Sequence, residues 1–199
     1  MSRPNWNSGQ ISDWANRGNL FSGSFIESGQ WWYASAFYSS PVSTAWPIIN
    51  RAYATRCFFH RPTTITAVGF NVTSGGTASN VVRLGLYTDN NGSPGIVVDQ
   101  TTVAGDSNGQ KTWTLTTPLS FTGLFWIAAA PQGSSTPGST WMTNGDYAFH
   151  LPNNSASMDT GLFNPAVPYW ATSTTFADNP SVTWENNVRN PVFHFRTQV

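Results

Sequence analysis

From residue 51 onward, apolar and polar residues alternate in short runs that clusters of Gly, Pro and Asn interrupt about every ten residues. In the run 81–87, Val82, Leu84 and Leu86 fall on one face of a chain with a two-residue period. Such a period is typical of strands, and the turn clusters are typical of short connections between antiparallel strands. Residues 51–199 are therefore predicted to form an all-β antiparallel sandwich or jelly roll.

The strands are not expected to be alike. Residues 52–59 and 63–73 read as two strands separated by Pro62. Trp113 and Leu115 alternate with threonines in 112–116, which predicts a strand with one solvated face. Residues 124–130 are apolar throughout and should form the most buried strand. In the last run, 192–196, Phe193 and Phe195 are expected to point inward and His194 outward.

Residues 1–50 show no sustained period and are rich in Gly, Ser, Asn and Trp, which predicts an extended arm preceding one domain at 51–199. Tryptophans on a free arm would expose a large apolar surface to water. The arm is therefore expected to dock on a neighbouring subunit. The alternative is that the arm folds back on its own domain. The predicted docking residues are Trp6, Trp14, Trp31, Trp32 and Tyr33.

Charged residues make up 9% of the chain, against about 25% in a typical soluble domain. Ser, Thr and Asn together account for 64 of the 199 residues, so hydroxyl and carboxamide groups must face water. The net charge is zero and the arginines are scattered, which predicts no nucleic-acid partner. The chain has no apolar run of about 18 residues and no apolar segment near Met1, so neither membrane insertion nor secretion is expected.

The residues that could carry chemistry form no recognisable pattern. Nine carboxylates are spread along the chain, mostly in turn clusters, whereas a glycosidase needs two carboxylates facing one bond. His60, His150 and His194 match no metal-ligand spacing. Cys57, the only cysteine, lies in an apolar run and is predicted to be a small core residue. We therefore expect no catalytic residue, no metal site and no cofactor.

Residues 82–89, 92–98 and 119–129 combine a strand, a turn containing Gly-Ser-Pro-Gly and an apolar aromatic strand. Together they resemble a β-sandwich, jelly-roll-like module of tailed-bacteriophage structural proteins, found in tail fibres, receptor-binding proteins and head-decoration or head-fibre proteins. The resemblance covers about residues 63–130. It implies a virion protein, assembled in the host cytoplasm, that forms a homo-oligomer, most often a trimer, and contacts capsid or tail proteins. A role in host attachment is also implied.

A carbohydrate-binding, lectin-like module that recognises a host cell-surface glycan is the alternative function. Sugar sites combine an aromatic ring with a few polar groups in an otherwise apolar setting. Loop-rich sequence near the end of the chain supplies both kinds of side chain, although ordinary core or interface aromatics would give the same pattern. The candidate glycan-binding residues are Trp141, Asn144, Asp146, Tyr147 and Trp170.

Overall fold

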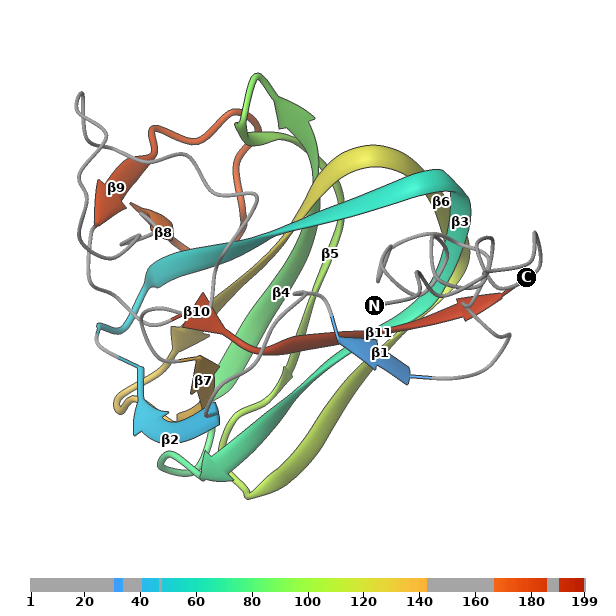
Figure 1. Cartoon of the computed structure of the whole chain (residues 1–199). Helices are drawn as coiled ribbons and strands as arrows, with labels where there is room; N and C mark the ends of the chain where they lie inside the picture. Colours follow the sequence, from blue (N-terminus) through green and yellow to red (C-terminus); the bar gives the residue numbers. More distant parts are fainter. Residues whose placement is uncertain (1–30, 34–40, 47, 143–166, 186–189, 199) are drawn as a thin grey trace, which may run out of the picture.

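The computed structural model describes residues 31–33, 41–46, 48–142, 167–185 and 190–198. These residues form an all-β fold of antiparallel strands and contain no helix, which confirms the predicted fold class (Figure 1). The strands are β1 (Trp31–Tyr33), β2 (Pro41–Ala45), β3 (Arg51–Ser74), β4 (Val81–Asn90), β5 (Ser93–Ala104), β6 (Gly109–Gln132), β7 (Gly138–Met142), β8 (Val167–Ala171), β9 (Thr183–Glu185), β10 (Asn190–Pro191) and β11 (Phe193–Gln198).

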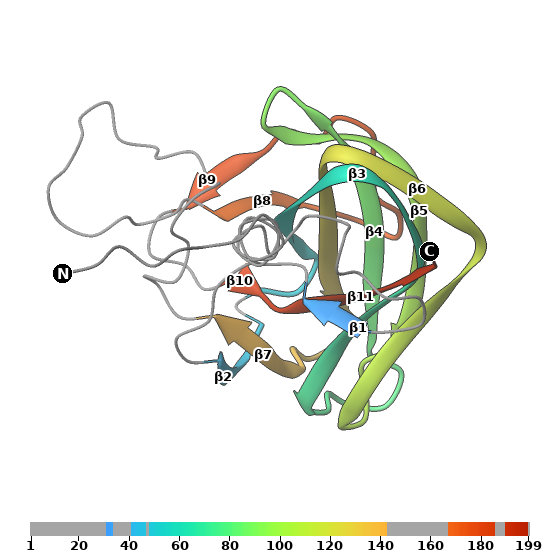
Figure 2. The same cartoon turned by 45° about the vertical axis from the view of Figure 1, so that its right-hand side comes forward.

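Two strands of 24 residues, β3 and β6, pair along their length and bend together (Figures 1 and 2). Their register shifts between Phe59 and Thr63 and again between Ile65 and Ala67, and such irregularities sharpen the bend of a strand. Pro62 was predicted to end a strand, but β3 continues through it. The first shift places Pro62 between paired residues, where its missing N–H costs no bond of the ladder.

The bend divides the curled sheet into two facing layers. The β4 layer contains β5, β4, β8, residues 123–132 of β6 and residues 51–59 of β3. The β11 layer contains β1, β11, residues 63–74 of β3 and residues 109–121 of β6. Each long strand therefore belongs to both layers, which gives the sheet its sandwich-like shape.

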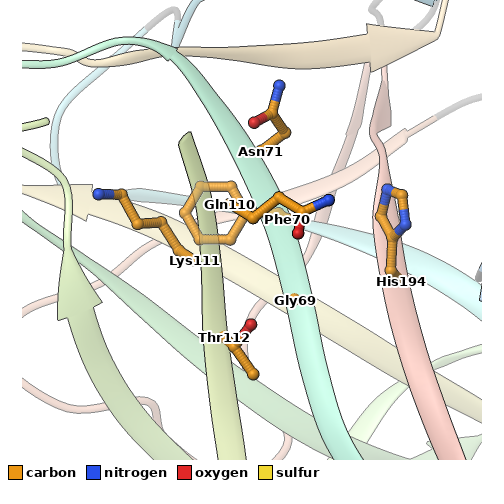
Figure 3. Close-up of a pocket in the computed structure, with 7 residues that line it drawn as sticks. All are labelled: Gly69, Phe70, Asn71, Gln110, Lys111, Thr112 and His194. Atoms are coloured by element: carbon orange, nitrogen blue, oxygen red, sulfur yellow. The ribbon is translucent and has the colours of Figure 1, made fainter. Parts of the chain in front are cut away.

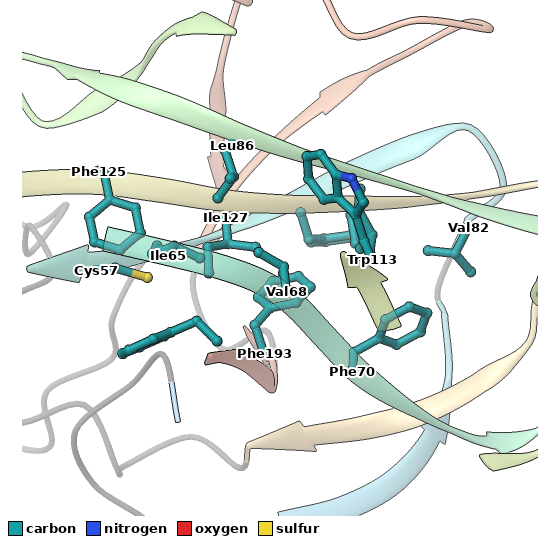
Figure 4. Close-up of a cluster of buried hydrophobic side chains, with 14 of the residues drawn as sticks. Cys57, Ile65, Val68, Phe70, Val82, Leu86, Trp113, Phe125, Ile127 and Phe193 are labelled. Atoms are coloured by element: carbon teal, nitrogen blue, oxygen red, sulfur yellow. The ribbon is translucent and has the colours of Figure 1, made fainter. Parts of the chain in front are cut away.

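A hydrophobic core fills the space between the layers (Figure 4). Phe59, next to the bend, contacts both sides: its ring centroid lies 4.9 Å from that of Phe125 and 5.1 Å from that of Phe195. Phe125 belongs to the β4 layer and Phe195 to the β11 layer. Cys57 is also buried here, as predicted, and burial raises the pKa of its thiol.

A second apolar cluster lies on the outer face of the β4 layer, around Tyr87 and Trp126. Trp170 of β8 adds its side chain to this cluster, and residues 172–184, which we call the C-terminal cover, lie over this face. Phe176 of the cover packs so closely on Gly85 that a Cβ atom there would lie 2.5 Å from its ring. The side chain of Gln100 accepts a hydrogen bond from the Phe176 N–H (2.8 Å) and donates one to its carbonyl (3.3 Å). Apolar side chains therefore pack on both faces of the β4 layer.

Two segments of the predicted arm belong to the curled sheet. β1 pairs with β11, and β2 pairs with β7. Trp46, directly after β2, is 1% exposed and packs in the central core. These contacts match the alternative in which the segments fold back on their own domain.

Candidate binding surfaces

Strand β5 forms one end of the curled sheet, because among the described residues it pairs only with β4. Its side chains include Ile96, which is 55% exposed, and Val98, which is 38% exposed. Ile48 is the one other large hydrophobic side chain that is exposed in the described part of the chain. Exposed aliphatic groups therefore gather on this edge strand.

The first half of the β5 edge is already occupied. The Asp178 carboxylate accepts a hydrogen bond from the Val97 N–H at 2.8 Å, and the Asn179 N–H donates to the Gly95 carbonyl at 2.7 Å. A register shift between Leu86 and Tyr87 of β4 leaves one β5 residue, Val98, without a counterpart in the ladder. Bulges and local side-chain contacts of this kind discourage another strand from pairing there.

The second half of the edge, residues 101–104, is different. Its sequence, Thr-Thr-Val-Ala, carries no charge, and the described residues provide no second strand that pairs with it. Edges that must stay unpaired usually carry charged residues or proline. Residues 101–104 have neither, so they can accept another strand.

A small hollow lies on the outer face of the β11 layer (Figure 3). His194 of β11, Gly69 of β3 and Thr112 of β6 are direct neighbours across the three strands. Gly69 contributes no side chain, so a gap opens between the other two. Asn71 and Gln110, the next outward pair on β3 and β6, border the gap, which has a volume of about 100 Å³.

Among the described residues, the side chains that line this hollow include no carboxylate. Burial lowers the pKa of His194, so its imidazole is neutral at pH 7. Lys111 also borders the hollow, but its side chain points to the far side of β6 from His194 in Figure 3, and its ammonium group donates to the Ser107 hydroxyl at 2.9 Å. Tyr33 of β1 lies opposite His194 in the register, which places β1 beside the hollow.

Asp89 is the most constrained carboxylate among the described residues. It accepts hydrogen bonds from the Trp126 indole N–H at 2.8 Å and from the Gly92 N–H at 3.0 Å. The guanidinium of Arg56 lies 4.0 Å from the same carboxylate and 5.3 Å from the centre of the Trp126 ring. Asp89 therefore holds the β4–β5 turn against the outer face of the β4 layer.

The other described carboxylates also make local structural contacts. Asp178 accepts from the Val97 N–H, as above, and Asp99 accepts from the Gln100 N–H at 2.8 Å. The remaining two are Asp106, which accepts from the Ser107 hydroxyl at 3.3 Å, and Glu185, which lies 3.8 Å from the Arg51 guanidinium.

Within the described ranges, no three His, Cys, Asp or Glu side chains lie close enough together to hold a metal ion. None of the described segments forms a helix of the length and apolarity needed to cross a membrane.

The predicted docking residues fall into two groups. Trp31, Trp32 and Tyr33 form β1, which pairs with residues 194–196 of β11. Trp6 and Trp14 lie outside the described residues. The prediction that these residues bind another subunit remains a prediction.

The predicted glycan-binding residues are only partly described. Trp170 is 4% exposed, and its ring makes an edge contact with Tyr87 at 5.6 Å, so little of the ring is left for a sugar. Trp141 belongs to β7, opposite Val42 of β2, whereas Asn144, Asp146 and Tyr147 lie outside the described residues. A site formed by these loop residues remains a prediction.

Sequence reasoning did not find the β5 edge or the hollow. The signal for the hollow was present, because Gly69 stands inside a predicted strand and an interior glycine often marks a place of close approach. No known family model matches the chain, and no curated protein matches it. The contacts of its own residues therefore carry the functional inference.

Proposed function

We propose that the chain is a non-catalytic structural protein of a tailed-bacteriophage particle, which acts by assembling with its own copies and with other particle proteins. The observation that carries this proposal is the uncharged β5 edge at 101–104, beside exposed Ile96 and Val98. An uncovered edge with neighbouring aliphatic groups is a surface that another protein can bury.

The charge of the chain supports assembly at high local concentration. A protein with zero net charge and 9% charged residues has little electrostatic repulsion between copies. The five described carboxylates are engaged in turns, strand edges and ion pairs, as expected of a protein that uses them to hold its fold. The resemblance of residues 63–130 to phage structural modules points to the particle as the place of assembly.

The order of strands is compatible with a ring of copies. β1 and β5 are the two ends of the path β1-β11-β3-β6-β4-β5. If residues 101–104 of one copy pair with β1 of the next, every copy uses one end of its sheet as donor and the other as acceptor. Such head-to-tail contacts form a closed ring when the rotation permits. A trimer is the ring we propose.

Immunogold electron microscopy tests the placement on the particle. Antibodies raised against the purified chain are applied to intact particles of the phage that encodes it, with particles of an unrelated phage as the control. We expect gold at one defined position, on the head or on the tail, of the first particles only. Unlabelled intact particles, combined with detection of the chain only in the particle-free fraction of the lysate, would refute a virion role.

A further inference from the structure

The hollow on the β11 layer brings together polar side chains from three neighbouring strands. Asn71 and Gln110 each offer a carboxamide, Thr112 offers a hydroxyl, and His194 offers an imidazole. All four border one gap above Gly69, the position at which β3 supplies no side chain (Figure 3). The gap is therefore open above Gly69 and bordered by polar side chains.

The charge state of these groups limits what the hollow can bind. Neither carboxamide nor hydroxyl is charged, and burial keeps His194 neutral at pH 7 by lowering its pKa. The ammonium group of Lys111 is bonded to Ser107 on the other side of β6. A charged ligand would lose hydration without meeting an opposite charge, whereas an uncharged polar group would exchange water for protein hydrogen bonds.

The volume of the hollow further limits which ligand group can fit. A volume of about 100 Å³ exceeds the space that a single water molecule needs and admits a small polar group. An acetamido group is a small polar group of this kind. Its N–H and C=O can pair with a carboxamide of the protein, which itself carries two donors and an acceptor on one planar group.

We propose that the hollow lined by Asn71, Gln110, Thr112 and His194 binds the uncharged amide group of a small ligand. Gly69 leaves the space, the two carboxamides recognise the amide, and Thr112 and His194 complete the hydrogen bonds at the sides. The amide can belong to an acetamido sugar or to a peptide-like compound, and the two sources share the same chemistry at the hollow.

Nuclear magnetic resonance of the full chain tests this site, with the ring signal of His194 as the reporter. The signal is assigned with a His194→Gln variant, because the chain has three histidines. N-acetylglucosamine and N-acetylglycinamide are the amide probes, while glucose and acetate serve as the controls without a neutral amide. We expect at least one amide probe to shift the His194 signal in a saturable way, and neither control to do so at the same concentration.

The two amide probes distinguish the sources. Binding of the sugar probe alone identifies an acetamido sugar, and binding of the peptide-like probe alone identifies a peptide-like ligand. Saturable binding of glucose would show hydroxyl recognition and overturn the proposal. Stronger binding of acetate would show an anion site, and no binding of either amide probe would show no amide site. Both results would also overturn it.

A matched pair of variants places the binding in the hollow. Thr112→Val removes the hydroxyl at the side of the gap and nearly conserves the shape of the side chain. Thr114→Val makes the same change two residues away, opposite Ala67 and outside the hollow. We expect Thr112→Val to weaken binding of the amide probe about 3- to 10-fold, as for the loss of one hydrogen bond, and Thr114→Val to change it less than twofold. Equal effects of the two variants would contradict the assignment.

This inference does not depend on the proposed assembly. Its site is formed by side chains of β3, β6 and β11, whereas the assembly proposal uses the backbone edges of β5 and of β1, the strand beside the hollow. Weaker amide binding in Thr112→Val at unchanged oligomeric mass would support the site without testing the assembly. If the chain is found on the particle but binds no amide probe, only the site is refuted.

Discussion

The two halves of β6 belong to the same strand, yet they lie in opposite environments. In residues 112–116, Trp113 and Leu115 are buried whereas the three threonines are exposed. In residues 125–130, every side chain is buried, because the central core covers one face and the C-terminal cover the other. The difference follows from what lies on the outer face of each layer.

This contrast shows how function and stability are divided over the molecule. The outer face of the β4 layer is closed by the chain itself, through Trp170, Phe176 and the hydrogen bonds of Gln100. The outer face of the β11 layer keeps threonines, carboxamides and His194 in contact with solvent. The first face stabilises the fold, and the second offers groups to a ligand.

Removing a large side chain from the closed face should have the largest effect. Trp126 is fully buried there and its indole N–H donates to Asp89. Trp126→Ala should lower the free energy of unfolding by about 3–5 kcal/mol, because it removes apolar contacts and leaves a cavity. Thr114→Ala, on the open face of the same strand, should change it by no more than about 0.5 kcal/mol. Urea unfolding measures both, and similar losses would abolish the contrast.

A smaller effect should come from the contact between Gly85 and Phe176. Gly85→Ala places a Cβ atom against the Phe176 ring and should destabilise the chain by about 1–3 kcal/mol. In a Phe176→Ala background the clash is gone, so the same substitution should cost about 1 kcal/mol less. Unfolding of the wild type, both single variants and the double variant gives this coupling. If the losses in unfolding free energy of the two single variants simply add up in the double variant, the cover does not pack on Gly85.

The smallest expected effect concerns pH and the open face. Burial lowers the pKa of His194 from its usual 6.5 in the folded state, so the unfolded chain takes up this proton first on acidification. Stability should therefore fall as the pH drops below 6.5, until the folded-state pKa is passed. His194→Gln should reduce this fall when unfolding is measured at pH 7.5 and at several lower values. A variant whose pH dependence equals that of the wild type would show that His194 does not contribute.

The sequence was sufficient to predict the all-β class and the environments of both halves of β6, because alternation directly reports which faces are buried. It did not predict that residues 52–59 and 63–73 form one bent strand. Pro62 is a valid sign of interruption, but the register shift that accommodates it depends on pairing with β6, which is far away in the sequence.

The burial of the outer face of the β4 layer could not be predicted from the sequence either. Phe176 is a single aromatic residue among Ser, Thr, Asp and Asn, a composition typical of a loop. It is buried only because Gly85 leaves room on β4 and Gln100 holds its backbone. Trp170 was assigned to a surface site for the same reason, since nothing local indicates that its ring packs on Tyr87. Tertiary contacts of this kind have no local signature.

The β5 edge carries the central claim, and light scattering of the purified full chain across a range of concentrations tests it most directly. We predict a mass three times the chain mass of 21.7 kDa, and a shift toward the monomer when Ile96 and Val98 are both replaced by Lys. Ile48→Lys, which adds a charge at an exposed aliphatic residue outside β5, should leave the mass unchanged. A monomeric mass for the wild type at every concentration, or an oligomer that the β5 substitutions do not affect, would contradict the account.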